Sequence, residues 1–272
     1  MFKLICLDMD GTLLNSRGEV SQRNLRAIKL AHGKGVKVTV CTGRLFTSAR
    51  FYADMLGVEV PVIASNGAYI REKDKNKVIY KSVLGYENSK KILEVYKKHN
   101  ITFYFNTCDT VFMERFDPEN GYVKINKTLP KHNQINIKVI EEWDKTLMEY
   151  EDEILKCICI DKDSDKIIKA KRDLLKLKEL EVVSSASNNI EAMVSGVSKG
   201  RAVEVLAGFY DFKREEIMCI GDNENDISML QYAGMGVAMR NGENEVKEIA
   251  DYVTDTNNDD GVAKAIEKFV LN

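Results

Sequence analysis

The chain has 272 residues, of which 44% are hydrophobic and 30% are charged, and its formal net charge is −2. This composition is ordinary for a globular protein, and the length suits one large domain or two smaller ones. The charge argues against a nucleic-acid-binding protein, and no apolar run is long enough to span a bilayer. Since the N-terminus also lacks a signal-peptide layout, we expect a cytoplasmic protein without nucleic-acid or membrane partners.

Apolar, β-branched runs alternate with helical patterns at both ends of the chain. Ser21 is expected to cap the first helix, and Gly33 and Gly35 to end it. The periodicity predicts strands over 4–7, 36–41, 62–64, 217–220 and 236–239, and further helices over 45–56, 200–209, 226–232 and 243–250. Such alternation predicts an α/β fold with a parallel sheet that is covered on both faces.

The middle of the chain has a different pattern. Helices are predicted over 88–98 and 166–177, and strands over 102–106, 111–114, 154–160 and 182–184. We therefore expect an inserted α+β domain over 85–188, between the two parts of the α/β core, 1–84 and 189–272. The lysines of the second helix are interpreted as a solvated face.

The cysteines and histidines do not form a metal-binding pattern. Cys157 and Cys159 share one face of a predicted strand, but no second pair has zinc spacing. We expect the cysteines to pack as small apolar side chains, and the three histidines to lie at the surface.

Two aspartates, Asp8 and Asp10, directly follow the first strand. Asp-x-Asp-Gly is often only a turn, and a calcium loop fits less well because the further acidic ligands of the EF-hand are missing. Carboxylates at the end of a parallel strand lie where α/β proteins bind ligands. One of the two could serve as a nucleophile and the other as a general acid and base.

Three further segments place polar groups after predicted strands or before a helix. Thr42 and Gly43 could bind an anion through a hydroxyl and backbone amides. Lys199, at the start of a helix, could place its ammonium on a phosphate. Asp222 and Asp226 supply hard oxygen ligands of the kind that Mg²⁺ prefers, although an Asp/Asn turn is the alternative for that loop.

Together, the four segments resemble the haloacid dehalogenase (HAD) superfamily, and most closely its Cof-type phosphatases, which carry a class IIB α+β cap. The motifs that carry the resemblance are DMDGT at 8–12, TGR at 42–44, GVSKG at 196–200 and GDNEND at 221–226, with the ASNGA loop at 64–68. The resemblance implies a Rossmann-like parallel-sheet core with the cap inserted between the second and third motifs.

The resemblance also implies site residues. Asp8 would be the nucleophile, Asp10 the general acid and base, and Mg²⁺ the cofactor. Thr42 and Lys199 complete the implied catalytic set. The implied metal-site residues are Asp8, Asp10, Asp222 and Asp226, of which Asp226 supports the metal site without being a direct ligand. The implied phosphate or substrate contacts are Met9, Thr42, Gly43, Arg44, Asn66, Lys199, Asn223 and Asn225.

The expected activity is Mg²⁺-dependent hydrolysis of a small phosphorylated metabolite, such as a sugar phosphate, through an aspartyl-phosphate. A phosphomutase that acts on sugar phosphates is the nearest alternative, since related enzymes share the intermediate. A non-catalytic metabolite-sensing regulator is an alternative of another class. The cap would select the substrate, but no segment of 85–188 identifies that substrate or the oligomeric state.

Overall fold

The computed structural model describes residues 1–57, 60–75 and 77–272. The chain forms two compact units. The first comprises residues 1–43, 52–80 and 198–272, and the second comprises residues 44–51 and 81–197.

The first unit is built on a parallel sheet with the strand order β14-β13-β12-β1-β2. Its strands are β1 (Leu4–Leu7), β2 (Lys37–Val40), β12 (Ile217–Gly221), β13 (Met235–Ala238) and β14 (Tyr252–Val253). A smaller sheet of β3 (Val62–Ala64), β4 (Tyr69–Arg71) and β5 (Val78–Lys81) is reached from β2 through a bridge between Cys41 and Ile63.

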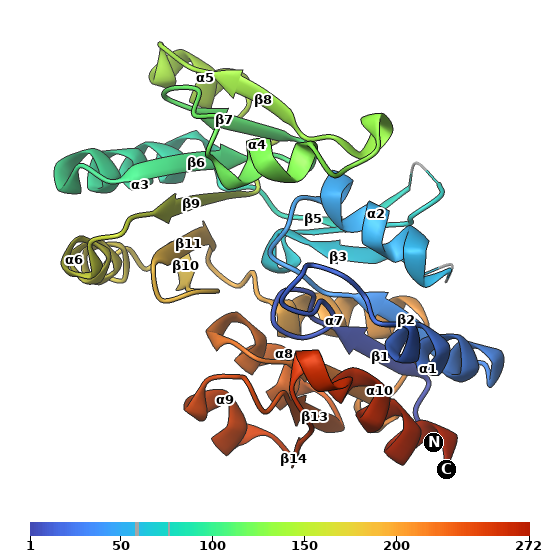
Figure 1. The fold of residues 1–272 in the computed structure, drawn as a ribbon. Coiled ribbons are helices and arrows are strands. Elements are labelled where there is room, and N and C mark those ends of the chain that lie inside the picture. Colours follow the sequence, from blue (N-terminus) through green and yellow to red (C-terminus); the bar gives the residue numbers. More distant parts are fainter. Residues whose placement is uncertain (58–59, 76) are drawn as a thin grey trace. The chain divides into compact units, whose positions relative to one another are not determined.

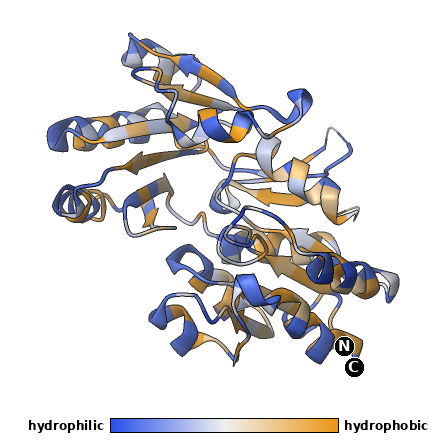
Figure 2. Cartoon of the chain, in the orientation of Figure 1, coloured by the Kyte–Doolittle hydropathy of each residue, from blue (hydrophilic) through white to orange (hydrophobic). Residues whose placement is uncertain are grey.

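Helices pack around this sheet, where α1 lies against α10 and α7 lies against α8 (Figure 1). The helices are α1 (Gln22–Gly33), α7 (Lys199–Phe209), α8 (Ile227–Tyr232), α9 (Asn244–Ile249) and α10 (Gly261–Ile266), which continues into the π-helix η6 (Glu267–Leu271). Ser21 caps α1 by accepting a hydrogen bond from the Asn24 amide, as predicted. The apolar strands and the mixed helix surfaces are visible in Figure 2.

The second unit has a mixed sheet with the order β10-β11-β9-β6-β7-β8, antiparallel except for the parallel pair β7–β8. The strands are β6 (Thr102–Asn106), β7 (Thr110–Met113), β8 (Asn136–Val139), β9 (Lys156–Ile160), β10 (Leu180–Val183) and β11 (Asn189–Val194). The helices are α3 (Gly85–His99), α4 (Gly121–Asn126), α5 (Trp143–Glu149) and α6 (Ser164–Leu174). Helix α2 (Phe46–Leu56) begins in this unit and ends in the first.

The predicted fold class, a parallel α/β core with a separate α+β sheet, is confirmed. Strand β11 joins the second sheet, so this sheet extends beyond residue 188, where we expected the insertion to end. A buried glutamate, Glu191, interrupts the apolar pattern of β11, so the sequence pattern did not predict this strand. The three-part domain division stays a prediction, because a compact unit is not in itself an independently folding domain.

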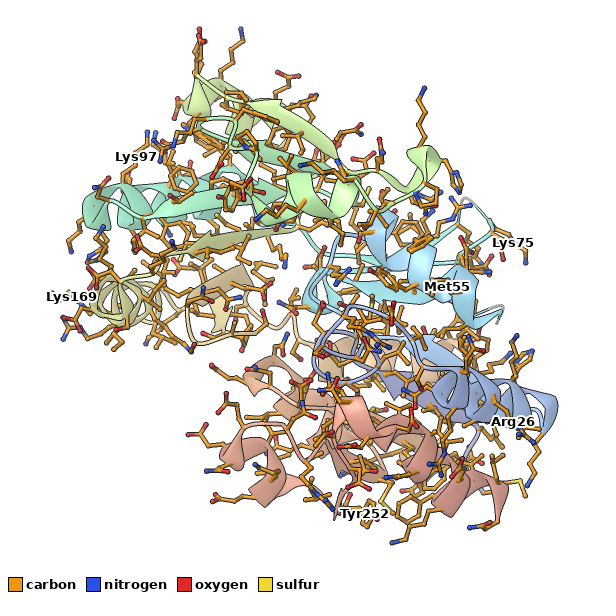
Figure 3. The ribbon with its side chains drawn as sticks, viewed as in Figure 1. Arg26, Met55, Lys75, Lys97, Lys169 and Tyr252 are labelled. Carbon is orange, nitrogen blue, oxygen red and sulfur yellow. The ribbon has the colours of Figure 1, made fainter. Side chains whose placement is uncertain are left out.

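The side-chain expectations are largely met. Cys6, Cys41, Cys157, Cys159 and Cys219 are buried as unpaired thiols. Lys169 extends outward from α6, as Lys97 does from α3 (Figure 3). His99 departs from the expectation, because it is half-buried and lies 3.0 Å from Asp173. Among the described residues, no helix is both long and apolar enough to cross a membrane.

Candidate active site

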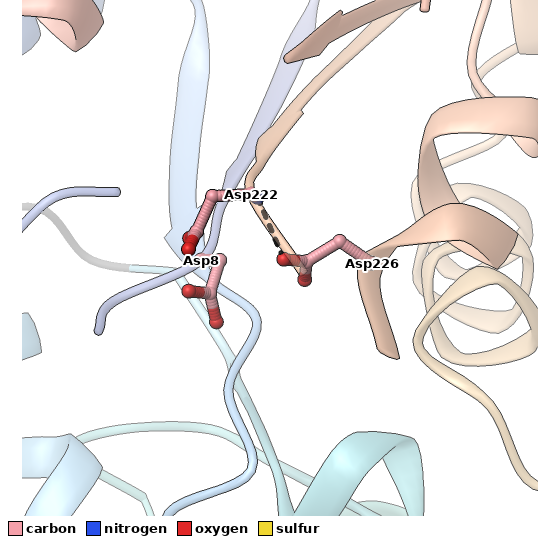
Figure 4. Close-up of side chains that lie close together, drawn as sticks. All are labelled: Asp8, Asp222 and Asp226. Atoms are coloured by element: carbon pink, nitrogen blue, oxygen red, sulfur yellow. Dashed lines mark hydrogen bonds between the residues drawn. The ribbon is translucent and has the colours of Figure 1, made fainter. Parts of the chain in front are cut away.

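Three parallel strands end level with one another and bring the polar segments to one sheet edge. Leu7 in β1 lies opposite Ile220 in β12 on one side and opposite Val40 in β2 on the other. The residues that follow these strands therefore emerge together. Figure 4 shows Asp8 beside Asp222, with Asp226 facing both.

Lys199 is the centre of the site. Its Nζ atom lies 2.5 Å from Asp8 Oδ1 and 2.5 Å from Asp226 Oδ1, and its side chain is fully enclosed. The residue begins α7, whose N-cap, Ser198, accepts a hydrogen bond from the Arg201 amide. The helix start thus fixes the backbone from which the lysine reaches two carboxylates.

Asp226 also organises the loop that carries Asp222. Its Oδ2 atom accepts hydrogen bonds from the amides of Asp222, at 2.9 Å, and of Asn223, at 3.0 Å. Both carboxylate oxygens of Asp226 are therefore engaged with protein groups. Its geometry favours a supporting role, in which it holds Lys199 and the Asp222 backbone in place.

Thr12 contributes a contact that the sequence did not assign. Its hydroxyl donates a 2.6 Å hydrogen bond to Asp222 Oδ1 and is fully buried. The only sequence signal was its place directly after Gly11 in the first motif. Thr12 fixes one oxygen of Asp222 and so orients the carboxylate.

Gly11 allows the first loop to pass close to Asp222. Its φ is +86°, and a Cβ atom built at this position would lie 2.3 Å from Asp222 Oδ2. Any side chain here would both strain the backbone and displace the carboxylate. The glycine is thus required by the close approach of the two loops.

The electrostatics of the cluster are unbalanced. The Lys199 ammonium bonds to Asp8 and Asp226, and Asp222 lies close to both carboxylates, so negative charge is in excess among these four groups. Burial and the neighbouring charge of Asp226 raise the pKa of Asp222 to about 7 and hold that of Asp8 well above its usual range. Burial alone would lower the pKa of Lys199, but the charges of Asp226 and Asp8 outweigh it and raise that pKa.

A divalent cation fits these residues. Asp8, Asp222 and Asp226 each offer a carboxylate oxygen, and these atoms lie within 4.8 Å of one another. The donors are all hard oxygens, and the uncompensated negative charge favours a cation at this place. Asp8 and Asp222 are the better ligands, because the oxygens of Asp226 are already bonded to protein groups.

The candidate phosphate contacts of the first unit surround the same edge. The Thr42 amide donates to Ile63 O and its carbonyl accepts from the Asn66 amide, which ties the second strand end to the 3₁₀ turn η1 (Ser65–Gly67). Asn225, in the 3₁₀ turn η4 (Glu224–Asp226), donates its side-chain amide to Asn66 Oδ1 at 3.1 Å. Thr42, Asn66 and Asn225 are buried polar groups of one connected network.

The other predicted residues take distinct positions. The Asp10 side chain is exposed, which suits proton exchange with solvent. Met9 is fully buried. Asn223 caps η4, and Gly43 lies next to Thr42. Arg44 belongs to the second compact unit.

Comparison with known proteins identifies this arrangement. Residues 5–266 match the family model of haloacid dehalogenase-like hydrolases. The chain belongs to this family. The structure of a haloacid dehalogenase-like hydrolase from B. subtilis superposes with a TM-score of 0.88 at 28% identity, covering 98% of this chain and 100% of the other.

Two further relatives indicate the activity and the cap class within the haloacid dehalogenase-like hydrolases. A 5-amino-6-(5-phospho-D-ribitylamino)uracil phosphatase of Bacillus subtilis (strain 168), YcsE, is 36% identical over 269 residues, covering 99% of this chain and 96% of the relative. A HAD subclass IIB sugar phosphatase of known structure has a TM-score of 0.79 and 26% identity, with 98% of each chain covered. The predicted family and the prediction of a phosphatase are confirmed.

Proposed function

We propose that this protein is a magnesium-dependent phosphatase that hydrolyses a small phosphomonoester through an aspartyl-phosphate. The observation that carries the proposal is the convergence of Asp8, Lys199 and Asp222 at one edge of the parallel sheet. Phosphoryl transfer depends mainly on positioning and on neutralising charge, and this cluster serves both purposes.

Asp8 is the proposed nucleophile. Lys199 engages its Oδ1 atom, which leaves Oδ2 to attack phosphorus while the ester P–O bond breaks. Asp10 gives its proton to the leaving oxygen, and then removes a proton from the water that attacks the aspartyl-phosphate. Cleavage of the bond between phosphorus and Asp8 releases inorganic phosphate and restores the carboxylate.

The remaining residues bind and orient the phosphoryl group. The Thr42 hydroxyl, the Gly43 amide and Asn225 donate hydrogen bonds to its oxygens, and Lys199 supplies a buried positive charge. Asn66 holds Asn225 in place through their side-chain hydrogen bond. Met9 and Asn223 are proposed to contribute through their backbone amides.

Asp8, Asp222 and the backbone carbonyl of Asp10 are the proposed ligands of Mg²⁺, with Asp226 as support. When bound, the ion would neutralise charge at the carboxylates and on the phosphoryl oxygens. The excess of negative charge in the cluster supports this proposal, since an anionic substrate would otherwise be repelled.

The substrate is proposed to be a small phosphorylated metabolite. A second B. subtilis relative, 32% identical over 98% of this chain, is also named a 5-amino-6-(5-phospho-D-ribitylamino)uracil phosphatase. That compound is therefore the first to test, together with sugar phosphates, nucleotides and pyridoxal phosphate.

The test is to incubate the purified chain with each ester and to measure both inorganic phosphate and the organic product. Phosphate release is expected with magnesium, loss of activity after chelation, and recovery when magnesium is returned. An isomerised sugar phosphate without phosphate release would indicate a mutase. Tight binding without any turnover would indicate a sensor, and full activity without a divalent ion would contradict the metal proposal.

A further inference from the structure

Helix α7, which presents Lys199, begins against two other segments of the first unit. One is α8, which follows directly after Asp226. The other is the 3₁₀ turn η1, which contains Asn66. The start of α7 is therefore the junction at which the backbones that carry Lys199, Asp226 and Asn66 meet.

Ser228, in the first turn of α8, makes a polar contact in this junction. The Gly200 amide donates a 3.0 Å hydrogen bond to Ser228 Oγ. Gly200 directly follows Lys199, and Ser228 lies two residues after Asp226. Because the first amides of a helix have no partner within the helix, the hydroxyl satisfies one of them and joins α7 to α8.

The backbones of the two helices lie very close together at this point. A Cβ atom built on Gly200 would lie 2.3 Å from the carbonyl oxygen of Ser228 and 3.1 Å from the backbone nitrogen of Met229. These neighbours are backbone atoms, which cannot rotate away as the end of a long side chain can. The hydrogen bond from Gly200 to Ser228 thus fixes a close backbone contact.

The turn η1 approaches α7 equally closely, just before Lys199. Gly67 has a φ of +96°, and a Cβ atom at this position would lie 2.3 Å from the carbonyl oxygen of Ser198. The residues that precede and follow Lys199 in the sequence therefore both contact neighbouring backbone. These contacts hold the backbone of Lys199 in one place.

The Lys199 side chain depends on that placement. Its Nζ atom bonds to Asp8 in the loop after β1 and to Asp226 before α8, and its side chain is fully enclosed. A movement of α7 away from α8 would change both contacts. Stabilisation of charge in phosphoryl transfer requires groups that are already in position, so a small movement should slow the reaction.

From this geometry we propose that Ser228 is a positioning residue for phosphoryl transfer, whose hydroxyl holds the start of α7 and so places the Lys199 ammonium. The proposal rests on the roles proposed above for Asp8 and Lys199. Ser228 acts through the Gly200 amide and does not itself contact the substrate. Loss of its hydroxyl should therefore reduce turnover by more than its effect on stability explains.

The first experiment compares S228A with S21A in the full chain. Ser21 is the matched control, because its hydroxyl also accepts a hydrogen bond from a helix amide, that of Asn24 at 3.1 Å, at the start of α1. Release of p-nitrophenol from p-nitrophenyl phosphate gives kcat and KM, and urea unfolding gives the stability of each variant.

Both variants should lower the urea midpoint slightly, because each loses one hydroxyl–amide hydrogen bond. Only S228A should also lower kcat, by about three- to tenfold, which corresponds to the loss of one such bond. Its KM should change by less than about twofold, because Lys199 acts mainly on charge that develops in the transition state.

A second pair of variants tests the same junction through its shape. G200A places a methyl group against the Ser228 backbone and should lower kcat by at least about tenfold. Gly208, near the end of α7, is the control, because a Cβ atom there meets no described atom within 4 Å. G208A should leave kcat within about twofold. S228A removes only a hydroxyl, so it decides the question even if G200A does not fold.

A kcat of S228A equal to that of the native chain, or equal losses of kcat in S228A and S21A, would overturn the positioning role and leave the phosphatase intact. A raised KM with unchanged kcat in S228A would also overturn it. If the native chain released phosphate neither from p-nitrophenyl phosphate nor from any metabolite ester tested, the proposed function would fail, and the positioning role with it.

Discussion

Each compact unit buries a lysine against carboxylates, and the two clusters differ in their charge balance. In the first unit, Lys199 faces Asp8 and Asp226, and Asp222 lies beside them. In the second unit, Lys156 pairs with Glu191 across the sheet, and both side chains are almost fully enclosed. The Ser185 hydroxyl donates to the other oxygen of Glu191 at 2.5 Å.

The difference separates the proposed active site from a structural ion pair. The pair of Lys156 and Glu191 is neutral as a whole, and its groups are satisfied by each other and by Ser185. The cluster around Lys199 retains an excess of negative charge. Buried charge that the protein leaves uncompensated is a common mark of a functional site, because a ligand is needed to balance it.

The largest expected effect is on turnover. Asp8→Asn keeps the shape of the side chain but removes the attacking oxygen anion, so kcat should fall by at least about a thousandfold. The urea midpoint should be equal or higher, because one of the crowded carboxylates has been neutralised. Phosphate release and urea unfolding measure the two effects.

Glu191→Gln is the matched control for that substitution. It should leave the turnover of the folded enzyme within about twofold and should lower its stability, since it removes the carboxylate charge that faces the buried Lys156. If both variants lost turnover alike, the distinction between the clusters would be wrong.

A smaller effect, on stability alone, is expected from dismantling the balanced pair. Lys156→Met or Glu191→Leu alone should each cost roughly 3–5 kcal/mol in the free energy of unfolding, because the remaining charge of the pair stays buried. The double variant should be within about 2 kcal/mol of the native chain, since an apolar pair replaces a desolvated ion pair. Urea unfolding of all four proteins gives the coupling energy. Additive losses in the double variant would show that the two residues do not act as a pair.

The smallest expected effect concerns an ionic cluster in the second unit, in which a partly buried carboxylate, Asp173, is paired with two exposed lysines and His99. Hydrogen bonds from Lys176, Lys98 and His99 hold the pKa of Asp173 below its usual range. A lowered pKa in the folded state stabilises the protein above the unfolded pKa of about 3.9, and that contribution disappears as the pH falls through the folded value. Asp173→Asn should therefore lower the urea midpoint slightly at pH 7, and the difference should shrink below about pH 4.

Asp152→Asn, at an exposed carboxylate outside this cluster, is the control for Asp173→Asn and should leave the midpoint unchanged at both pH values. A difference between Asp173→Asn and the native chain that persisted unchanged at low pH would show that the ion pairs are not its source.

The sequence predicted the core better than the second unit, for a physical reason. Buried parallel strands such as β1 and β12 are continuous apolar runs, and the chemistry follows their ends in short motifs. In the second unit, β8 has a largely exposed pattern, and α4 and α5 are one or two turns long. Such elements are stabilised by tertiary packing, so local periodicity does not reveal them.

The same contrast holds for side chains. Asp8, Lys199 and Asp222 could be predicted because each follows a strand or begins a helix within a recognisable motif. The hydrogen bonds from Thr12 to Asp222 and from Asn225 to Asn66 join residues that are 210 and 159 positions apart in sequence. No local pattern encodes these features, so only the structure reveals them.

The position of β1 in the sheet has a consequence for the order of folding. This strand is near the N-terminus, yet one of its two neighbours is β12, which leaves the ribosome more than two hundred residues later. The ribosome adds about 5–20 residues per second, so the edge of β1 that pairs with β12 stays unpaired for roughly 10–40 seconds during synthesis. The second unit is complete before β12 arrives. Asp8 and Asp222 meet only when β12 adds to β1, so the proposed active site is assembled late in folding.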